Sequence, residues 1–409
     1  MLVARVFVPF ALGYLLSYLI RTINAVAGEP ISAELGLSAG ELGFLTSAYF
    51  AGFAIAQLPG GILIDRYGPR RVEALVFLLA AGGCLIFAVA GGTAHLILGR
   101  ALMGFGASIC LMAPLSAYLR WFPGERLPLV NGLHMAFGAA GGFLAGAPVD
   151  GLIHLVGWRQ TFAFVAVAIV VVCLAIWLVV PPSGDPRKRT GFAILWRELG
   201  TIAADRRFWR LVPLSTAIQG AVLSIGSLWT GPWLRQVAGL TDEVAADWLS
   251  IYALAVLVGF IGTGWIAQQA NRRGLAEPTF VGLTVVFLAI EALIVALPAA
   301  AGVWLWIPYM AVGVFAIHLY AATARFFPLE MVGRVNTLHN FVVFVAAFLV
   351  QWLFGVWLDL FPNEAGTGSL RIGFDTGFAI LAALQVAGLV PLLLMRRRID
   401  ETPAARPAA

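Results

Sequence analysis

The sequence predicts an all-α integral membrane protein with twelve transmembrane helices in two pseudo-symmetric six-helix bundles. The chain is 61% hydrophobic and 11% charged, with a mean hydropathy of +0.91, whereas soluble domains are about half apolar and a quarter charged. Its apolar runs are about 20 residues long and lack the alternation of a membrane β-barrel. The two halves also share sequence patterns at a nearly constant offset. Lipid is therefore the solvent for most of this chain.

The apolar runs place six spans in each half. The first run begins near Arg5 and is too long for the hydrophobic region of a signal peptide, and because it also lacks a clear cleavage site we expect it to be retained. The expected spans of the first half are 6–28, 41–64, 72–91, 95–120, 128–152 and 158–180. Those of the second half are 208–236, 246–270, 278–298, 302–326, 335–361 and 374–395.

One long polar break divides the chain. It contains a basic cluster around Lys188 and then an apolar stretch, 192–199, that suits a short surface helix. We therefore expect four parts: an N-terminal bundle at 1–180, a cytoplasmic linker at 181–207, a C-terminal bundle at 208–398 and a disordered cytoplasmic tail at 399–409.

The basic residues indicate the orientation in the membrane. Most of the 26 Lys and Arg residues fall at the termini or in loops on one side of the spans, while the opposite loops carry acids such as Glu29 and Asp242. Cytoplasmic loops carry an excess of Lys and Arg, so we expect both termini to be cytoplasmic. The net charge of +5 then reflects orientation and gives no support for a nucleic-acid partner. The near absence of lysine, with abundant Ala and Gly, is typical of a GC-rich bacterial genome, so we expect the membrane to be the inner membrane of a bacterium.

A sequence repeat relates the halves. Residues 122–134 and 327–339 both read F-P followed by V-N-x-L-H, at an offset of 205 residues. A charged turn at 60–71, G-G-I-L-I-D-R-Y-G-P-R-R, has a weaker counterpart at 264–273, in which Gln268 replaces the acid and a basic pair remains. Such internal repeats are typical of secondary transporters.

The charged turn resembles the signature loop of the major facilitator superfamily, G-x-x-x-D-R-x-G-x-R-R, between the second and third helices of that fold. In that family the loop latches the halves together while the cavity opens outward. The resemblance assigns this latch role to Gly61, Asp65, Arg66, Gly68, Arg70 and Arg71. Asp65 has several possible partners, namely Arg70, another arginine such as Arg120, or the N-terminus of the eleventh helix. The resemblance also implies a monomer that binds a small-molecule substrate, together with a coupling ion, within the lipid bilayer.

A polar stripe on the first span is the main candidate for substrate binding. It consists of Tyr14, Ser17, Arg21 and Asn24, whose spacing places them on one side of a helix. An arginine within a span costs about 2.5–3.5 kcal/mol near the membrane centre, so Arg21 should face a cavity or a partner. Alternatively, Arg21 extends to the outer interface, since it lies past the midpoint of the span.

Arg100 is the second intramembrane cation. It stands in R-A-L-M-G-F-G, which resembles the fourth-helix motif R-x-x-x-G-x-G of the same family, associated there with proton coupling or substrate contact. Gly104, one turn further on, allows another helix to approach. A substrate-binding and a proton-coupling role are both open for Arg100.

Further candidates come from the fifth, seventh, tenth and eleventh spans. Gln219 lies on the repeat mate of the first span, so it is expected to face Arg21 across the cavity. The other candidates are Asn131, His134, His318, His339 and Asn340. Histidine titrates near neutral pH, so His134, His318 and His339 are also candidates for proton coupling. A structural role is equally open for each histidine.

The function class follows from what the cavity helices carry. The first, fourth, seventh and tenth spans contain Arg21 and Arg100 but no carboxylate at matching depth, which favours a small organic or inorganic anion. The alternative is a proton-driven exporter of drugs or other lipophilic compounds, suggested by the glycine-rich fifth span. No catalytic motif, P-loop or metal-binding spacing occurs, so we expect no enzyme activity, no cofactor and no metal. The third class is a non-transporting membrane protein, such as a transceptor or a multi-span enzyme.

Overall fold

The computed structural model describes residues 3–182, 192–328, 331–361 and 368–395, and this part of the chain is helical without strands. The predicted disordered tail at 399–409 lies outside the described residues. Ten helical segments are long and apolar enough to cross a membrane, and two further pairs, Arg5–Thr22 with Asn24–Leu35 and Leu129–Leu144 with Ala147–Val156, are each bent by 43°. Counting each bent pair as one span confirms the twelve predicted spans.

The first half contains the first six spans. Its helices are α1 (Val8–Thr22), α2 (Asn24–Leu35), α3 (Ala39–Tyr67), α4 (Pro69–Ala88), α5 (Thr93–Ala107), α6 (Met112–Trp121), α7 (Leu127–Leu144), α8 (Ala147–Val156) and α9 (Trp158–Val179). Short irregular turns divide three spans in this half, α1 from α2, α5 from α6 and α7 from α8.

The second half repeats this arrangement. After the linker helix α10 (Phe192–Ala204), it consists of α11 (Val212–Ser224), η4 (Ile225–Trp229), α12 (Thr230–Pro232), η5 (Trp233–Val237), α13 (Asp242–Arg272), α14 (Ala276–Ala296), α15 (Ala299–Gly313), η6 (Val314–Ile317), α16 (His318–Ala324), α17 (Val332–Leu358) and α18 (Ser369–Leu394). The π-helical turns η4 and η5 interrupt the seventh span, and the 3₁₀ turn η6 interrupts the tenth.

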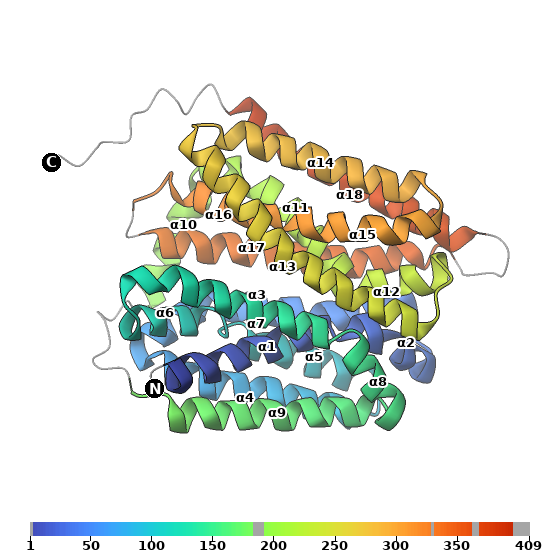
Figure 1. The fold of residues 1–409 in the computed structure, drawn as a ribbon, viewed down its shortest axis with the longest axis horizontal. Coiled ribbons are helices and arrows are strands. Elements are labelled where there is room, and N and C mark those ends of the chain that lie inside the picture. The colour runs from blue at the N-terminus through green and yellow to red at the C-terminus, as the bar shows by residue number, and fades with distance from the viewer. Residues whose placement is uncertain (1–2, 183–191, 329–330, 362–367, 396–409) are drawn as a thin grey trace.

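The two halves lie one above the other, with the helices of each half running roughly side by side (Figure 1). Helices α3 and α17 form the most extensive packing between the halves, and α13 packs on α7 and α8. The linker helix α10 bridges the halves as well, because Leu195 and Leu199 pack against Ile62 of α3 and Leu338 of α17. The short surface helix expected at 192–199 is therefore present and continues to Ala204.

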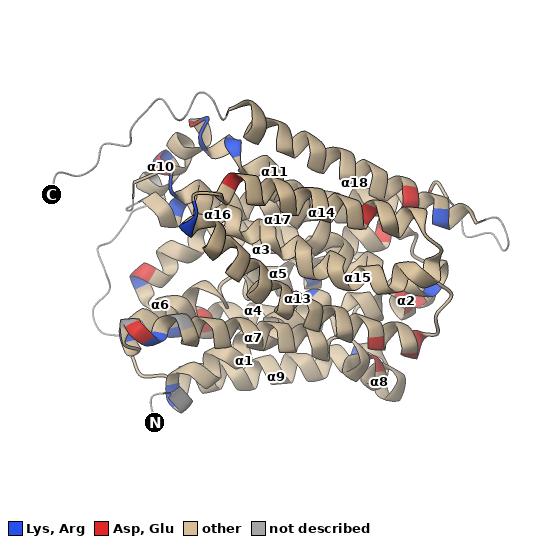
Figure 2. Cartoon of the chain, turned by 45° about the horizontal axis from the view of Figure 1, so that its top comes forward, with Lys and Arg blue, Asp and Glu red and all other residues tan. Residues whose placement is uncertain are grey.

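The ends of the spans differ in charge. Figure 2 shows Lys and Arg gathered at the end that holds the chain termini, and most Asp and Glu at the opposite end. We refer to these as the basic end and the acidic end. Glycine and proline make the tight turn at the basic end, where Gly68 has a φ of +82° and Pro69 begins α4.

Polar contacts join the halves at the acidic end. The carboxylate of Asp359, just after α17, accepts hydrogen bonds from Ser38 Oγ at 3.0 Å, from the Ala39 N–H at 2.8 Å and from the Gly40 N–H at 2.9 Å, all at the start of α3. Ser38 itself caps α3 in a capping box with Glu41. An acid of one half thus stabilises the N-terminus of a helix in the other half.

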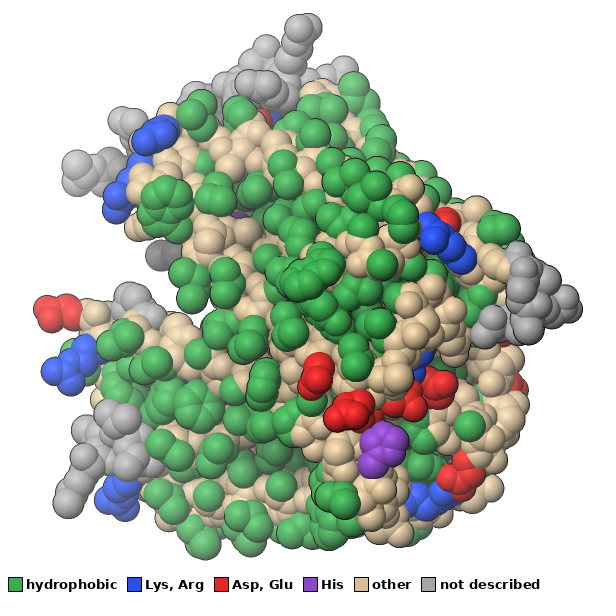
Figure 3. Space-filling view, turned by 45° about the vertical axis from the view of Figure 1, so that its right-hand side comes forward, with side chains coloured by type: hydrophobic (Ala, Val, Ile, Leu, Met, Phe, Trp, Pro, Cys, Tyr) green, Lys and Arg blue, Asp and Glu red, His purple; other side chains and the backbone are tan. Residues whose placement is uncertain are grey.

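Two further contacts close the acidic end. Arg235 pairs with Glu29 and donates to the Ala25 carbonyl at 3.0 Å. Ser250 Oγ accepts from the Ala147 N–H at 2.9 Å, at the bend between α7 and α8. At the basic end, by contrast, the space-filling view shows a notch between the halves (Figure 3). These polar contacts thus hold the halves together at the acidic end, whereas a notch lies between them at the basic end.

Candidate functional site

A cavity of about 240 Å³ lies between the halves, lined by side chains from both. The first half contributes residues of α1, α3 and α5 to α7, and the second half residues of α11, α13, α15 and α17. Most of the lining is apolar. The polar side chains are those of Tyr14, Tyr18, Arg21, Thr22, Gln57, Ser108, Gln219, Ser227, Tyr252 and Asn340.

Arg21 is the charged group of this cavity: among the described residues that line it, no other is acidic or basic. Its guanidinium carbon lies 4.4 Å from the ring centroid of Tyr18 and 5.3 Å and 5.7 Å from those of Phe53 and Phe344. Aromatic faces hold a cation without neutralising it. The described part of the chain supplies no acidic partner for Arg21, so its charge is available to a ligand.

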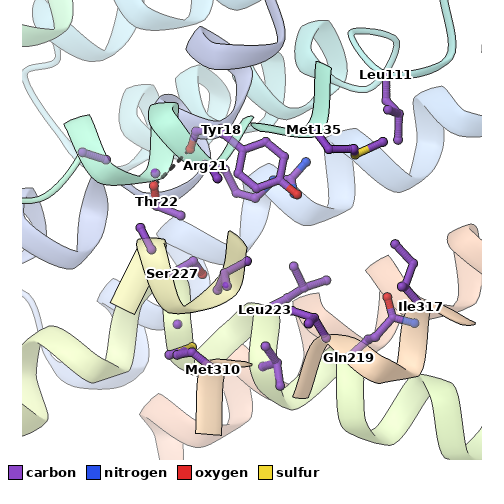
Figure 4. A pocket seen from close by; sticks show the side chains of 18 of the residues that line it. Tyr18, Arg21, Thr22, Leu111, Met135, Gln219, Leu223, Ser227, Met310 and Ile317 are labelled. Atoms are coloured by element: carbon purple, nitrogen blue, oxygen red, sulfur yellow. Dashed lines mark hydrogen bonds between the residues drawn. The ribbon is translucent and has the colours of Figure 1, made fainter. Parts of the chain in front are cut away.

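The opposite wall comes from the second half. Gln219 donates through Nε2 to Ser215 Oγ at 2.8 Å and to the Ala316 carbonyl at 3.3 Å. Asn340 Oδ1 accepts from the hydroxyl of Tyr320 at 3.0 Å. Figure 4 shows Gln219 across the cavity from Arg21, as expected from the repeat.

The residues of the polar stripe lie in two different surroundings. Tyr14 and Arg21 line the cavity, whereas Ser17 and Asn24 do not. Ser17 Oγ donates to the carbonyl of Tyr14 at 2.7 Å, and Asn24 Nδ2 donates to Thr46 Oγ1 of α3 at 3.0 Å. Ser17 and Asn24 therefore have local structural partners on or beside the α1–α2 span.

Arg100 is buried away from the cavity lining. Its Nη1 donates to the Ile20 carbonyl at 2.7 Å, and its guanidinium carbon lies 5.1 Å from the ring centroid of Tyr49. Ile20 shortly precedes the bend between α1 and α2. A carbonyl at a helix break in the membrane needs a substitute donor, so this geometry indicates a structural contact for Arg100. Gly104 of α5 allows α3 to approach closely, since a Cβ at Gly104 would clash with the backbone carbonyl of Tyr49.

The three candidate histidines lie outside the cavity lining, each in a different setting. The ring of His134 stacks on Tyr14 at 4.5 Å, with Nδ1 3.1 Å from the Tyr118 hydroxyl and Nε2 3.3 Å from the Cys110 carbonyl. His318 Nε2 lies 3.1 Å from Thr263 Oγ1.

His339 is fully buried and stacks on Tyr320 at 3.8 Å, and neither ring nitrogen has a hydrogen-bond partner among the described residues. His134 stacks on Tyr14, which itself lines the cavity. Asn131 is half-buried on α7 and also outside the lining.

Sequence reasoning did not select several lining residues. Tyr18 is one helical turn from Tyr14 on the same span, so its spacing was a usable signal. Gln57 Nε2 donates to the Ser108 carbonyl at 3.2 Å, where the fourth span is interrupted between α5 and α6. No local pattern announces that interruption.

The signature loop lies at the basic end, away from the cavity. Asp65 is exposed and makes no hydrogen bond or ion pair with the described residues. Arg70 donates to the Trp177 carbonyl within the first half, Arg66 lies over the ring of Tyr67, and Arg71 is exposed. A Cβ at Gly61 would meet nothing within 4 Å, so no helix approaches it in this conformation. Within the described residues, the charged side chains of the loop make no hydrogen bond or ion pair with the second half.

No cluster of three or more His, Cys, Asp or Glu residues suited to a metal ion occurs within the described ranges. The three cysteines, Cys84, Cys110 and Cys173, are free and buried.

Comparisons with known proteins agree with this architecture. A family model described as Major Facilitator Superfamily matches residues 10–351. The chain is 23% identical to a probable sulfoacetate transporter of Cupriavidus necator, covering 93% of this chain and 92% of the relative. It is 24% identical to a hexuronate transporter of Bacillus subtilis, covering 92% of each. It is 22% identical to a probable L-galactonate transporter of Escherichia coli, covering 94% and 88%.

Solved structures resemble the fold throughout. A bacterial homologue of the human lysosomal transporter Spinster, in an inward-facing and occupied conformation, aligns with a TM-score of 0.78 at 19% identity, covering 98% of this chain and 99% of that one. A D-xylose–proton symporter aligns with a TM-score of 0.74 at 15% identity, covering 97% and 98%.

Proposed function

Because this chain belongs to the Major Facilitator Superfamily, we propose that it is a secondary transporter that moves a small organic anion across a membrane by alternating access. One observation carries the choice of an anion. Arg21 is buried in the central cavity with aromatic rings around it and no acidic residue among the described lining. A buried charge without a partner is costly. A ligand carboxylate or sulfonate offsets that cost and fits the guanidinium in a bidentate pair.

The size of the cavity supports a small solute. Pockets for drug-sized ligands have volumes of about 300–1,000 Å³, and this cavity measures about 240 Å³. A lipophilic cation would also meet Arg21 as a like charge. Both features disfavour the alternative of a drug exporter.

The relatives support an organic rather than an inorganic anion. Sulfoacetate, hexuronate and galactonate, the compounds in their names, are all organic acids. Identities of 22–24% leave the particular compound open for this chain.

The two ends of the molecule support alternating access. We place the basic end in the cytoplasm of a bacterium, with both termini there, because basic loops face the cytoplasm. The present conformation then faces inward. The six latch residues, Gly61, Asp65, Arg66, Gly68, Arg70 and Arg71, would join the halves in the outward-facing state, when the basic end is closed. We retain bundles at 1–180 and 208–398 as the rigid units, and a monomer as the working form.

Coupling to protons is part of the proposal. His134 is the preferred carrier, because its ring stacks on Tyr14, which lines the cavity. Arg100, His318 and His339 remain secondary candidates. Three of the substrate-binding candidates from the sequence are instead assigned to positioning the cavity helices: Ser17, Asn24 and Asn131. Uptake that survives collapse of the proton gradient would exclude this coupling.

The test uses the purified protein, with binding of organic anions measured by thermal shift and their uptake measured in liposomes. We expect an organic anion such as galactonate or sulfoacetate to raise the melting temperature, because a ligand that binds only the folded state stabilises it. Arg21→Gln should weaken binding by about 30-fold or more, since truncating a buried charge pair costs about 2–5 kcal/mol. Arg371→Gln is the control, because Arg371 pairs with Asp375 at the acidic end. Equal binding by the Arg21 variant and the wild type would reject the proposal.

A further inference from the structure

We propose that Gln219 selects hydroxylated organic anions, by accepting a hydrogen bond from a substrate hydroxyl through its side-chain oxygen. This inference rests on the proposed transport of an organic anion and names a substrate class within it. The two walls of the cavity then have different tasks. Arg21 binds the charged group of the substrate, and Gln219 binds the hydroxylated part of the substrate.

The orientation of the Gln219 amide follows from its neighbours. Nε2 donates to Ser215 Oγ at 2.8 Å and to the Ala316 carbonyl at 3.3 Å. The Ser215 hydroxyl donates in turn to the same carbonyl at 3.2 Å, which leaves its oxygen free to accept from Nε2. Reversing the amide would place Oε1 against a carbonyl that can only accept. Oxygen and nitrogen of an amide are assigned from such contacts, and the contact with the Ala316 carbonyl favours Nε2 on this side.

Oε1 is consequently directed into the cavity. Figure 4 shows the oxygen of Gln219 pointing into the space between the halves, toward the wall that holds Arg21. No hydrogen bond of Oε1 with the described residues accompanies those of Nε2. When a substrate displaces water from this atom, it must provide a donor, because an unpaired buried acceptor is costly.

Asn340 adds a complementary group. Its Oδ1 is occupied by the Tyr320 hydroxyl, so its Nδ2 is the group left to donate toward the cavity that Asn340 lines. A hydroxyl both donates and accepts, and it therefore suits a wall that offers an acceptor from Gln219 and a donor from Asn340. An ammonium group suits it less, because the described lining has no carboxylate to compensate a second cation.

The experiment compares acids of equal chain length. Galactonate and hexanoate share a six-carbon chain and one carboxylate, and only galactonate carries hydroxyl groups; galactarate and adipate form the same comparison for two carboxylates. Binding of all four is measured by thermal shift and by inhibition of uptake in liposomes. Wild-type protein should prefer the hydroxylated member of at least one pair, and Gln219→Leu should reduce that preference by about tenfold.

Two further variants keep the test decisive. Ser215→Ala removes one of the two groups that orient the amide, and it should reduce the same preference even if Gln219→Leu does not fold. Gln219→Glu keeps an acceptor, so it should retain the preference while weakening both acids. Thr284→Val is the matched control, because Thr284 is buried on α14 and donates to the Phe280 carbonyl, outside the cavity lining.

The outcomes separate the two proposals. If both acids of a pair bind in an Arg21-dependent manner but Gln219→Leu and Ser215→Ala leave their ratio unchanged, the role of Gln219 is wrong and anion transport stands. If no acid binds, or if binding does not depend on Arg21, the proposed function fails first.

Discussion

Replacing Asp359 tests how this transporter keeps its acidic end closed. The carboxylate bonds Ser38 and the first N–H groups of α3, so Asp359→Ala removes an interaction between the halves. Loss of a hydrogen bond costs about 0.5–1.5 kcal/mol net, and loss of a negative charge at a helix N-terminus costs about 0.3–1 kcal/mol. The site is exposed, so we expect a total of about 1–2 kcal/mol. The ratio of closed to open acidic ends should then fall by about 5- to 30-fold.

Spin labels at Ala33→Cys and Glu243→Cys report this change as a distance between the halves. Both positions are exposed at the acidic end, and the three native cysteines are buried. The longer distance should gain population in Asp359→Ala. Asp375→Asn is the control, since Asp375 pairs with Arg371 inside one helix at the same end. An unchanged distribution in Asp359→Ala, or an equal change in the control, would refute the reasoning.

Two other substitutions probe the packing around the α1 bend. Arg100→Leu leaves the Ile20 carbonyl unpaired, so it should reduce the free energy of unfolding by about 1–3 kcal/mol and lower the melting temperature. The fraction that folds should bind substrate normally. Lost binding at an unchanged melting temperature would instead support a substrate contact for Arg100. Gly104→Val should prevent the close approach to Tyr49 and cost at least about 1–3 kcal/mol, seen as loss of monodisperse protein in size-exclusion chromatography. Gly82→Val is its control, because a Cβ at Gly82 would meet nothing within 4 Å, and an equal loss in both variants would contradict this explanation.

The twelve spans were predictable because a bilayer imposes a local rule. Each span needs a continuous apolar run of fixed minimum length, and the chain must satisfy that rule segment by segment. The bends near Ile23 and Ala145 were not predicted. The second bend coincides with Pro148 in the first turn of α8, which interrupts the helix locally. Groups remote in sequence contact both bends, Arg100 at the first and Ser250 at the second.

The candidate site was predictable only in part, and for the same reason. Arg21 stands out because a charge in an apolar run is conspicuous whatever surrounds it. Arg100, Ser17 and Asn24 present a similar local signal, yet they contact neighbouring backbone and helices instead of the cavity. Periodicity shows which residues share a face of a helix, but the packing of the other helices decides where that face points.

The order of residues along the chain is sufficient to predict the membrane class, the repeat, the charged turn and the arginine within the first span. Each of these features depends on short-range composition or spacing. Tertiary structure decides the remaining features. It pairs Asp359 with the start of α3, leaves Asp65 without a described partner, and turns the oxygen of Gln219 toward Arg21. The Asp359 contact joins residues 320 positions apart in different halves, and the contact of Gln219 with Ala316 joins residues 97 positions apart within one half. Both contacts exist only once distant helices have packed together.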